Sequence, residues 1–356
     1  MKKIILIFFL LLGSFSTQAS GEPQSPDEPV DAFGLIMDHI SDAHQWHVVD
    51  YTNSRGHEVH INVPLPVILW HNNSLWFFSS GHFYHEQEPQ QLGNDYVILH
   101  EEQFYITGDE GELEMDAEGN IRNASPLDFS ITKNVASMIL SMALLLLMFL
   151  SAGKAYARHG IAPARGFRAV LEPLILFVRD DIARSQIAKD KADKFVPFLL
   201  TMFFFIWINN LIGIIPFFPG GSNLSGNISF TATLAVFSFL VINVFAVKDY
   251  WKHIFLAPGM PFPIKILLVP LEFIGIFTKP FALMIRLFAN ITAGHIIILS
   301  LISIIFIIKS IYIAPVSILL SLVMFLLELL VAVLQAYIFT LLTALFIGMS
   351  TTKSEH

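Results

Sequence analysis

The sequence predicts an all-α polytopic membrane protein with a small β-rich domain at its amino-terminal end. Of the 356 residues, 54% are hydrophobic and 14% are charged, whereas soluble domains have about 45–50% and about 25%. Several apolar runs reach the roughly 18 residues that indicate a membrane helix. Charge is also segregated: between Gly21 and Ser130 the only cations are Arg55 and Arg122, among many carboxylates. An acidic extramembrane part and a basic membrane part are therefore expected.

Composition also excludes several function classes. The chain has no cysteine, which rules out disulfides, thiolate chemistry and thiol metal sites. It has no Gly-x-x-x-x-Gly-Lys-Ser/Thr loop, so we expect no nucleotide chemistry in this chain. Neither a cofactor nor a nucleic-acid partner is expected.

Residues 1–20 are predicted to be a signal peptide. Lys2 and Lys3 precede a short apolar core, and Thr17-Gln-Ala19 is a small-residue cleavage site. The alternative is an uncleaved first membrane helix. The apolar core from Ile4 to Leu12 is too short for that, because a helix needs about 20 residues to cross the roughly 30 Å hydrocarbon core.

Residues 21–130 are predicted to be a small β-rich extracytoplasmic domain. They begin with a linker rich in proline and acid, and continue with alternating segments between turn signals such as Asn72-Asn73. Nine of the thirteen histidines lie here, and six of them form His-x-x-His pairs: His44/His47, His57/His60 and His82/His85. These pairs are candidates for a metal site or for plain polar surface. We favour polar surface, because the segments look strand-like or irregular and residues three apart on a strand point to opposite faces.

Five membrane segments follow in residues 131–356, at about 131–151, 195–218, 228–247, 264–308 and 311–348. The segment between the first two, Lys154 to Lys194, is rich in Lys and Arg, so the positive-inside rule places it in the cytoplasm. The acidic domain is then periplasmic and the carboxyl terminus cytoplasmic, in a cell inner membrane. Within the basic segment, Phe167 to Ile187 has the apolar spacing of an amphipathic helix at the bilayer interface.

The last two segments are longer than a membrane crossing requires. About 45 residues at 1.5 Å each make roughly 67 Å, against a core of about 30 Å. Either both are strongly inclined helices that form a hairpin at Lys309-Ser310, or the fourth is broken at one of its helix breakers: Pro270, Gly275, Pro280 or Gly294. We favour the inclined hairpin.

Both long segments carry polar stripes. Glu272, Lys279 and Arg286 are seven residues apart and share a helix face. Asn290 lies about 40° from Arg286, and His295 lies about 180° round. The fifth segment has a second stripe of polar residues, Ser321, Glu328 and Gln335.

Each of these residues has a structural alternative. Lys279 and Glu272 can snorkel to the interface. His295, Gln335, Asn209 and Asn210 can serve as hydrogen-bond partners between helices. Ionisable groups within a membrane are functional by default, and arginine stays charged at any accessible pH. A fixed cation beside titratable Glu and His suits proton movement, with the moving carboxylate on a partner protein.

Three motifs resemble subunit a of the F-type ATP synthase: Lys279-Pro-Phe-Ala-Leu-Met-Ile-Arg-Leu-Phe-Ala-Asn290, Ala293-Gly-His295 and Leu334-Gln-Ala-Tyr-Ile-Phe339. The resemblance covers about residues 130–356. It implies a stator subunit whose inclined hairpin wraps a ring of c subunits, with a b-type peripheral stalk subunit and the other ATP synthase subunits as further partners. It also implies two half-channels separated by an essential arginine, here Arg286.

The resemblance assigns proton access to five further positions: Glu272, Asn290, His295, Glu328 and Gln335. Asn210 and Ser321 are candidates to line the channel. Some members of the family have Glu where this chain has His295, and His where it has Glu328. The exchange suggests that the two side chains face each other. The acidic domain is an addition to the short tail of many bacterial members.

Two other function classes stay open. A secondary transporter with a midplane site in a broken fourth segment is the alternative to the stator subunit, although the internal repeat typical of such proteins is not evident. The amino-terminal domain could instead be a metal-binding module. The sequence leaves open whether the coupling ion is H⁺ or Na⁺.

Overall fold

The computed structural model describes residues 41–52, 58–86, 89–116, 120–159, 166–215, 218–258, 260–308, 310 and 312–352. The chain divides into two compact units. Unit 1 holds the β-strands, the start of the first long helix as far as Ile139, and the segment Ile215–Ser222. Unit 2 holds the other helices. The predicted signal peptide and the acidic linker after it lie outside the described residues.

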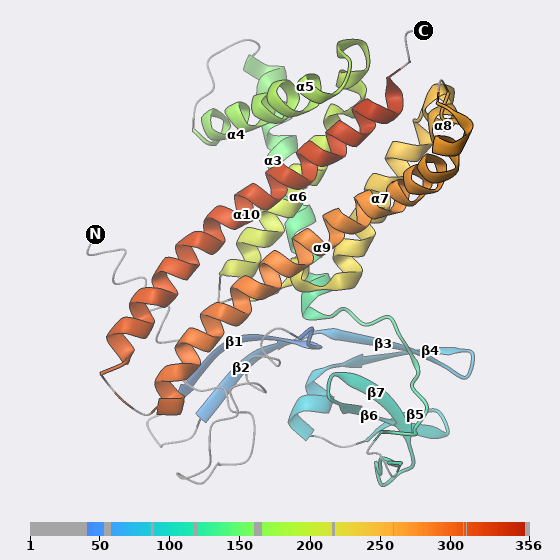
Figure 1. Ribbon diagram of the computed structural model, residues 1–356. Helices are drawn as coiled ribbons and strands as arrows, with labels where there is room; N and C mark the ends of the chain where they lie inside the picture. Colours follow the sequence, from blue (N-terminus) through green and yellow to red (C-terminus); the bar gives the residue numbers. More distant parts are fainter. Residues whose placement is uncertain are drawn as a thin grey trace. The chain divides into compact units, whose positions relative to one another are not determined.

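The described residues of unit 1 form three small antiparallel sheets (Figure 1). The first sheet pairs β1 (Gln45–Thr52) with β2 (Glu58–Pro64). The second has the order β4 (Ser74–Ser79), β3 (Pro66–His71), β8 (Leu127–Asp128). The third has the order β5 (Gln90–Leu92), β6 (Asp95–His100), β7 (Gln103–Thr107). The prediction of a small β-rich amino-terminal region is therefore confirmed.

The core of unit 1 lies between the second and third sheets. Val67 and Leu69, on one face of β3, are fully buried and pack with Leu92, Val97 and Phe104. This is the alternation expected of a strand with one buried face.

Two local segments of unit 1 can be compared with the secondary structure predicted from the sequence. The predicted turn at Asn72-Asn73 joins β3 to β4, and both asparagines have positive φ angles, 48° and 62°, as a two-residue hairpin turn requires. The expectation of strand-like or irregular structure at His82 and His85 is wrong. His82–Glu86 forms a short helical turn, η1, which begins where Phe83 N and Tyr84 N donate to the Ser80 carbonyl.

Unit 2 is helical (Figure 1). Its elements are α3 (Lys133–His159, shared with unit 1), α4 (Phe167–Leu176), η2 (Phe177–Ala183), α5 (Arg184–Gln186), α6 (Lys189–Ile214), η3 (Leu224–Gly226), α7 (Ile228–Val244), α8 (Lys248–Leu256), α9 (Phe262–Ile308) and α10 (Ala314–Thr351). Four helices of the described chain are long and apolar enough to cross a membrane, and a fifth span results if α7 and α8 count as one bent segment. The chain is thus a multi-pass membrane protein.

The bounds of the helices differ from those of the predicted membrane segments. α3 continues to His159 rather than ending at 151, and α6 runs from Lys189 to Ile214 rather than from 195 to 218. An apolar run marks the part of a helix suited to lipid, whereas the helix itself continues into polar residues. α6 ends before Pro216, because proline disfavours the helical conformation in the residue that precedes it. α8, which is bent by 99° from α7, was not predicted.

The amphipathic helix predicted from Phe167 to Ile187 is confirmed as a helical segment. α4, η2 and α5 follow one another without interruption to Gln186, with a π-helical stretch in the middle. Leu171, Val178 and Ile182 on its apolar face are buried in the core of unit 2. Its position at a bilayer interface stays a prediction.

α9 decides between the two alternatives for the fourth segment. It is one helix from Phe262 to Ile308, with Pro270 and Pro280 inside it, so a break at these positions or at the two glycines is wrong. α9 packs against α10, and the two form the expected hairpin (Figure 1). Their inclination to the membrane stays a prediction.

The carboxyl-terminal end of α10 is fixed by three neighbouring segments. A Cβ at Gly348 would overlap the backbone carbonyl of Gln186, so only glycine allows this close approach. Lys191 Nζ donates to the Thr351 carbonyl at 2.7 Å, and Val247 N donates to the Ser350 carbonyl at 2.9 Å. These contacts position the helix that carries Glu328 and Gln335.

Candidate functional site

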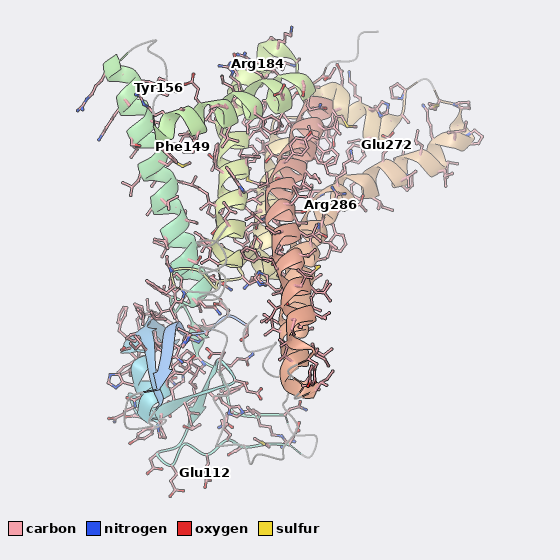
Figure 2. All side chains as sticks on the ribbon, turned by 90° about the vertical axis from the view of Figure 1, so that its left-hand side faces the viewer. Glu112, Phe149, Tyr156, Arg184, Glu272 and Arg286 are labelled. Carbon is pink, nitrogen blue, oxygen red and sulfur yellow. The ribbon has the colours of Figure 1, made fainter. Side chains whose placement is uncertain are left out.

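Arg286 lies on the exposed side of α9 (Figure 2). Leu283, Leu287 and Ile291 turn the neighbouring face of the helix into the protein, where all three are buried. Within the part of the chain that the structure describes, Arg286 has no ion pair or hydrogen bond. A charged side chain on an apolar helix surface therefore remains available to a partner.

Small residues surround Arg286 on the same side of the helix. Ala282, Ala289 and Ala293 lie within about 60° of Arg286 on a helical projection, and all three are exposed. Small side chains on a membrane helix let a second helix approach closely. The small side chains around Arg286 would thus allow a second helix to approach closely.

His295 and Glu328 meet across the α9–α10 hairpin. His295 Nε2 lies 3.4 Å from Glu328 Oε1, and both side chains are largely buried. Gly294 makes room for this pair, because a Cβ there would lie 2.9 Å from Glu328 Oε1 and 3.2 Å from its Cδ. The structure thus places the two residues against each other, as their exchange relative to other family members suggested. Gly294 was missed as a site residue because sequence spacing does not reveal a close approach between helices.

A second pair of polar side chains connects the same two helices. Asn290 Nδ2 donates to Gln335 Oε1 at 3.0 Å. Deeper in the protein, Ser225 Oγ donates to Asn210 Oδ1 at 2.5 Å, and Asn210 Nδ2 donates to the Ala332 carbonyl at 3.4 Å. Asn210 therefore connects α6 to α10 at Ala332, about one helical turn before Gln335.

The polar stripe of α10 is buried, although some of its polar atoms form no hydrogen bond with the described protein. Ser321, Glu328 and Gln335 are at most 5% exposed. Among the described residues, nothing forms a hydrogen bond with Ser321 Oγ, Glu328 Oε1 or Gln335 Nε2. Buried polar atoms in proteins are nearly always paired with protein or with water, so these three are the places where water would bind.

Glu272 is separate from this group and lies nearer the α8 end of α9 (Figure 2). His253 Nδ1 of α8 is 3.1 Å from Glu272 Oε2. Lys279, one heptad further on, places Nζ 5.3 Å from the ring centre of Phe346. Sequence spacing could not single out His253, because its contact with α9 depends on the bend between α7 and α8.

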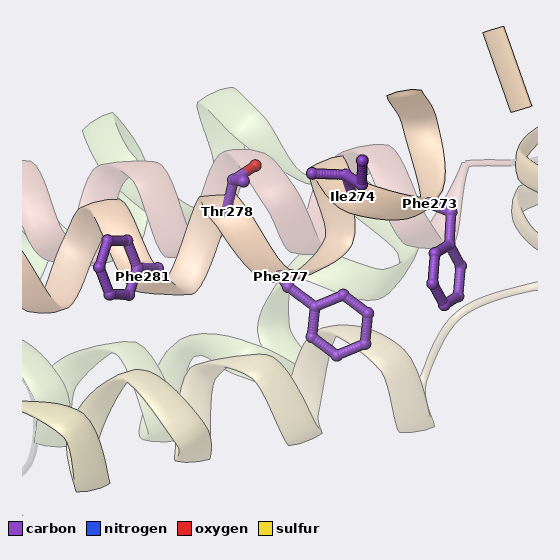
Figure 3. Close-up of a pocket in the computed structure, with 5 residues that line it drawn as sticks. All are labelled: Phe273, Ile274, Phe277, Thr278 and Phe281. Atoms are coloured by element: carbon purple, nitrogen blue, oxygen red, sulfur yellow. The ribbon is translucent and has the colours of Figure 1, made fainter. Parts of the chain in front are cut away.

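A shallow apolar hollow of about 350 Å³ lies along α9 (Figure 3). It is lined by Phe273, Ile274, Phe277, Thr278 and Phe281. The ring of Phe239 on α7 stacks on Phe277 with 5.6 Å between centroids. With one hydroxyl as its only polar side chain, the hollow does not suit an ion.

The His-x-x-His pairs do not form a metal site in the described part of unit 1. His57 lies outside the described residues, as do the side chains of His60 and His85. His47 Nδ1 lies 2.9 Å from Asn62 Oδ1. The described residues contain no group of three or more acidic, His or Cys side chains able to hold a metal.

His44 is instead buried and belongs to an acid–histidine cluster that the sequence did not reveal. Its Nδ1 is 3.0 Å from Glu102 Oε2 and its Nε2 is 3.0 Å from Asp128 Oδ2. Tyr84 donates its hydroxyl hydrogen to the other Glu102 oxygen. Burial lowers the pKa of His44, but the hydrogen bonds and charges of Asp128 and Glu102 outweigh it and raise the pKa from 6.5 to about 9.

Comparisons with known proteins divide the chain in a similar way. Residues 135–348 match the family described as ATP synthase A chain, and residues 35–129 match a Domain of unknown function (DUF8433). ATP synthase subunit a of Chloroherpeton thalassium is 48% identical over 64% of this chain and 69% of its own length. ATP synthase subunit a 2 of Prosthecochloris aestuarii is 46% identical over 64% and 71%.

A third relative matches over more of the chain. ATP synthase subunit a of Pelodictyon phaeoclathratiforme is 41% identical over 76% of this chain and 80% of its own length. The family model alone matches more than half of the chain and includes Arg286, the α9–α10 hairpin and the polar residues between them. The chain therefore belongs to the family of subunit a of the F-type ATP synthase.

Proposed function

We propose that this chain is the stator subunit that conducts protons through two half-channels to and from a carboxylate on the rotor ring of c subunits. Arg286 is the fixed charge that separates the half-channels. The observation that carries the proposal is the exposed Arg286 without a partner in the described chain, surrounded by small residues on an apolar helix. A passing carboxylate would supply the partner, and the permanent cation would keep that carboxylate ionised beside it.

One half-channel follows the buried polar residues between α9 and α10. His295 and Glu328 can exchange protons, and Asn290 and Gln335 can hold and orient water. The buried atoms without protein hydrogen bonds, Ser321 Oγ among them, support a hydrated path. The other half-channel begins at Glu272, which His253 contacts from α8. These assignments place proton access on two sides of Arg286 along α9.

The proposed setting is a cell inner membrane, with unit 1 in the periplasm and the carboxyl terminus in the cytoplasm. The many Lys and Arg residues between α3 and α6 support this sidedness. The proposed partners are the c ring and a b-type peripheral stalk subunit. Membership of the subunit a family favours this function over a secondary transporter.

The test is Arg286→Ala in the assembled complex, reconstituted in sealed vesicles. We expect ATP synthesis driven by a proton gradient to be lost, because a rotor carboxylate would no longer be held ionised at this point. Lys279→Ala, seven residues earlier on the same helix, is the matched control and should retain synthesis. Retained coupled synthesis in Arg286→Ala complexes would overturn the proposal.

A further inference from the structure

One face of the β4-β3-β8 sheet is apolar and exposed. On β3 the side chains alternate, so Val67 and Leu69 enter the core while Ile68 and Trp70 point away from it. The register places Phe77 opposite Ile68, and Leu75 and Leu127 opposite Trp70. The face continues to Phe129, whose N donates to the Ile68 carbonyl. We call these residues the outer sheet face: Ile68, Trp70, Leu75, Phe77, Leu127 and Phe129.

The exposure of this face is unusual for an acidic extramembrane domain. Phe77 is 67% exposed, and Leu127 and Phe129 are each 61% exposed. The remaining strand residues that point the same way are Pro66 and Ser79, so this side of the three strands carries no charged side chain. Soluble proteins seldom leave a continuous apolar surface in water, and such a patch marks a binding surface.

The chain itself places this face close to a membrane span. α3 begins at Lys133, four residues after Phe129, and four extended residues reach at most about 14 Å. Hydrogen bonds of unit 1 fix the link: Ile131 N donates to the Pro66 carbonyl at 3.0 Å, and Lys133 N donates to the Ala43 carbonyl at 2.8 Å. Phe129 and the strands beside it therefore lie close to the start of a candidate membrane span, and the lipid headgroups extend several ångströms beyond the hydrocarbon core.

We propose that the outer sheet face is seated in the headgroup layer of the bilayer and anchors the amino-terminal domain to the membrane surface. Trp and Phe side chains suit this layer, where an apolar surface enters by about 5–10 Å. The absence of basic residues from the face indicates zwitterionic rather than anionic lipid, because the domain as a whole is acidic. This inference depends on α3 as a membrane span and not on the proton path around Arg286.

The test uses the full chain in phosphatidylcholine vesicles, labelled at single cysteines with an environment-sensitive fluorophore. The natural chain has no cysteine, so Phe77→Cys and Phe129→Cys each give one label on the outer sheet face. Gln103→Cys, an exposed position on β7 of the same domain, is the matched control. Lipids that carry a doxyl quencher near the headgroup should quench both face labels severalfold more than the control label. Lipids with the quencher near the acyl-chain end should have little effect.

Equal, weak quenching at all three positions would overturn the proposal. A face label that is shielded from aqueous iodide but not quenched by doxyl lipid would also overturn it, because protein rather than lipid would then cover the face. The same measurement on the assembled complex shows whether another subunit replaces the lipid. Passive proton conduction should be unchanged in Phe77→Cys. A negative quenching result would therefore contradict the membrane anchor without contradicting the proposed proton-conducting function.

Discussion

His44 stabilises a turn, between β6 and β7, whose backbone conformation is strained. The two-residue turn between β6 and β7 consists of Glu101 and Glu102, both with positive φ angles, 47° and 61°. Asn and Gly are the usual residues of such a turn, because other side chains are strained there. Glu102 accepts from the backbone N of His44 at 2.9 Å and lies beside its ring. The cluster therefore offsets the strain of the turn.

The stabilising effect of this cluster should depend on pH in a defined direction. The pKa of His44 is raised from 6.5 to about 9, so its contribution is fully present below pH 6.5 and is lost as pH rises through about 9. Burial raises the pKa values of Glu102 and Asp128, but the hydrogen bonds from His44 outweigh it and leave both below their usual 4.5 and 3.8. Their contribution is present above those values and is lost in acid. The cluster should be most effective between about pH 5 and 6.5.

His44→Gln should therefore destabilise unit 1, most strongly at about pH 5 to 6.5 and least above pH 9. We expect about 2 kcal/mol, less than the roughly 3–5 kcal/mol for a fully buried pair, because the two carboxylates keep some solvent contact. Amide hydrogen exchange of β7 and β8 in the full-length protein measures the change. His47→Gln, whose ring contacts the neutral amide of Asn62, is the control. A loss that is the same at all pH values would contradict an ionic role for His44.

At the scale of elements, the sequence predicted what depends on periodicity. Seven-residue spacing placed Ser321, Glu328 and Gln335 on one face of α10, and the structure buries all three. The length of the fourth apolar run predicted α9. Periodicity could not predict the close approach of Gly294 to Glu328 or the contact between His253 and Glu272, because both depend on how separate helices pack. The His44 cluster was missed for the same reason, since its members are 58 and 84 residues apart.

The contact between α9 and α10 gives a second prediction. His295→Ala and Glu328→Ala should each reduce proton conduction. The double variant should lose less proton conduction than the product of the two single losses predicts. We expect the difference to be roughly fivefold, a coupling energy of about 1 kcal/mol. The physical reason is that the two side chains lie 3.4 Å apart, so removal of one already abolishes the interaction. Passive proton flux through vesicles that contain the complex measures each variant.

The exchanged pair is the matched control for this cycle. His295→Glu together with Glu328→His restores the order found in some members of the family, and it should conduct better than either single exchange. Losses that multiply independently in the alanine cycle, with no recovery in the exchanged pair, would show that the two residues act separately.

At the scale of the whole molecule, the exposed surface of α9 is where the proposed function places the rotor ring. α9 buries one side against α7 and α10, while Arg286 and the alanines around it stay exposed. A membrane helix facing only lipid would gain nothing from a charged residue at this depth. This exposed cation is what the proposed function requires, in which a helix of the rotor ring brings the moving carboxylate to Arg286.

Close contact with that helix should be sensitive to the size of the residues beside Arg286. Ala293→Trp should leave folding intact, because Ala293 is exposed, but it should hold the partner helix away from Arg286. We expect proton-driven ATP synthesis to fall by at least about tenfold, since a misplacement of about 1 Å between reacting groups can cost up to about 10²-fold. Phe281→Trp, exposed about 220° round the helix from Arg286, is the control and should have little effect. If both variants retain synthesis in vesicles that contain normal amounts of assembled complex, the surface around Arg286 does not face the rotor.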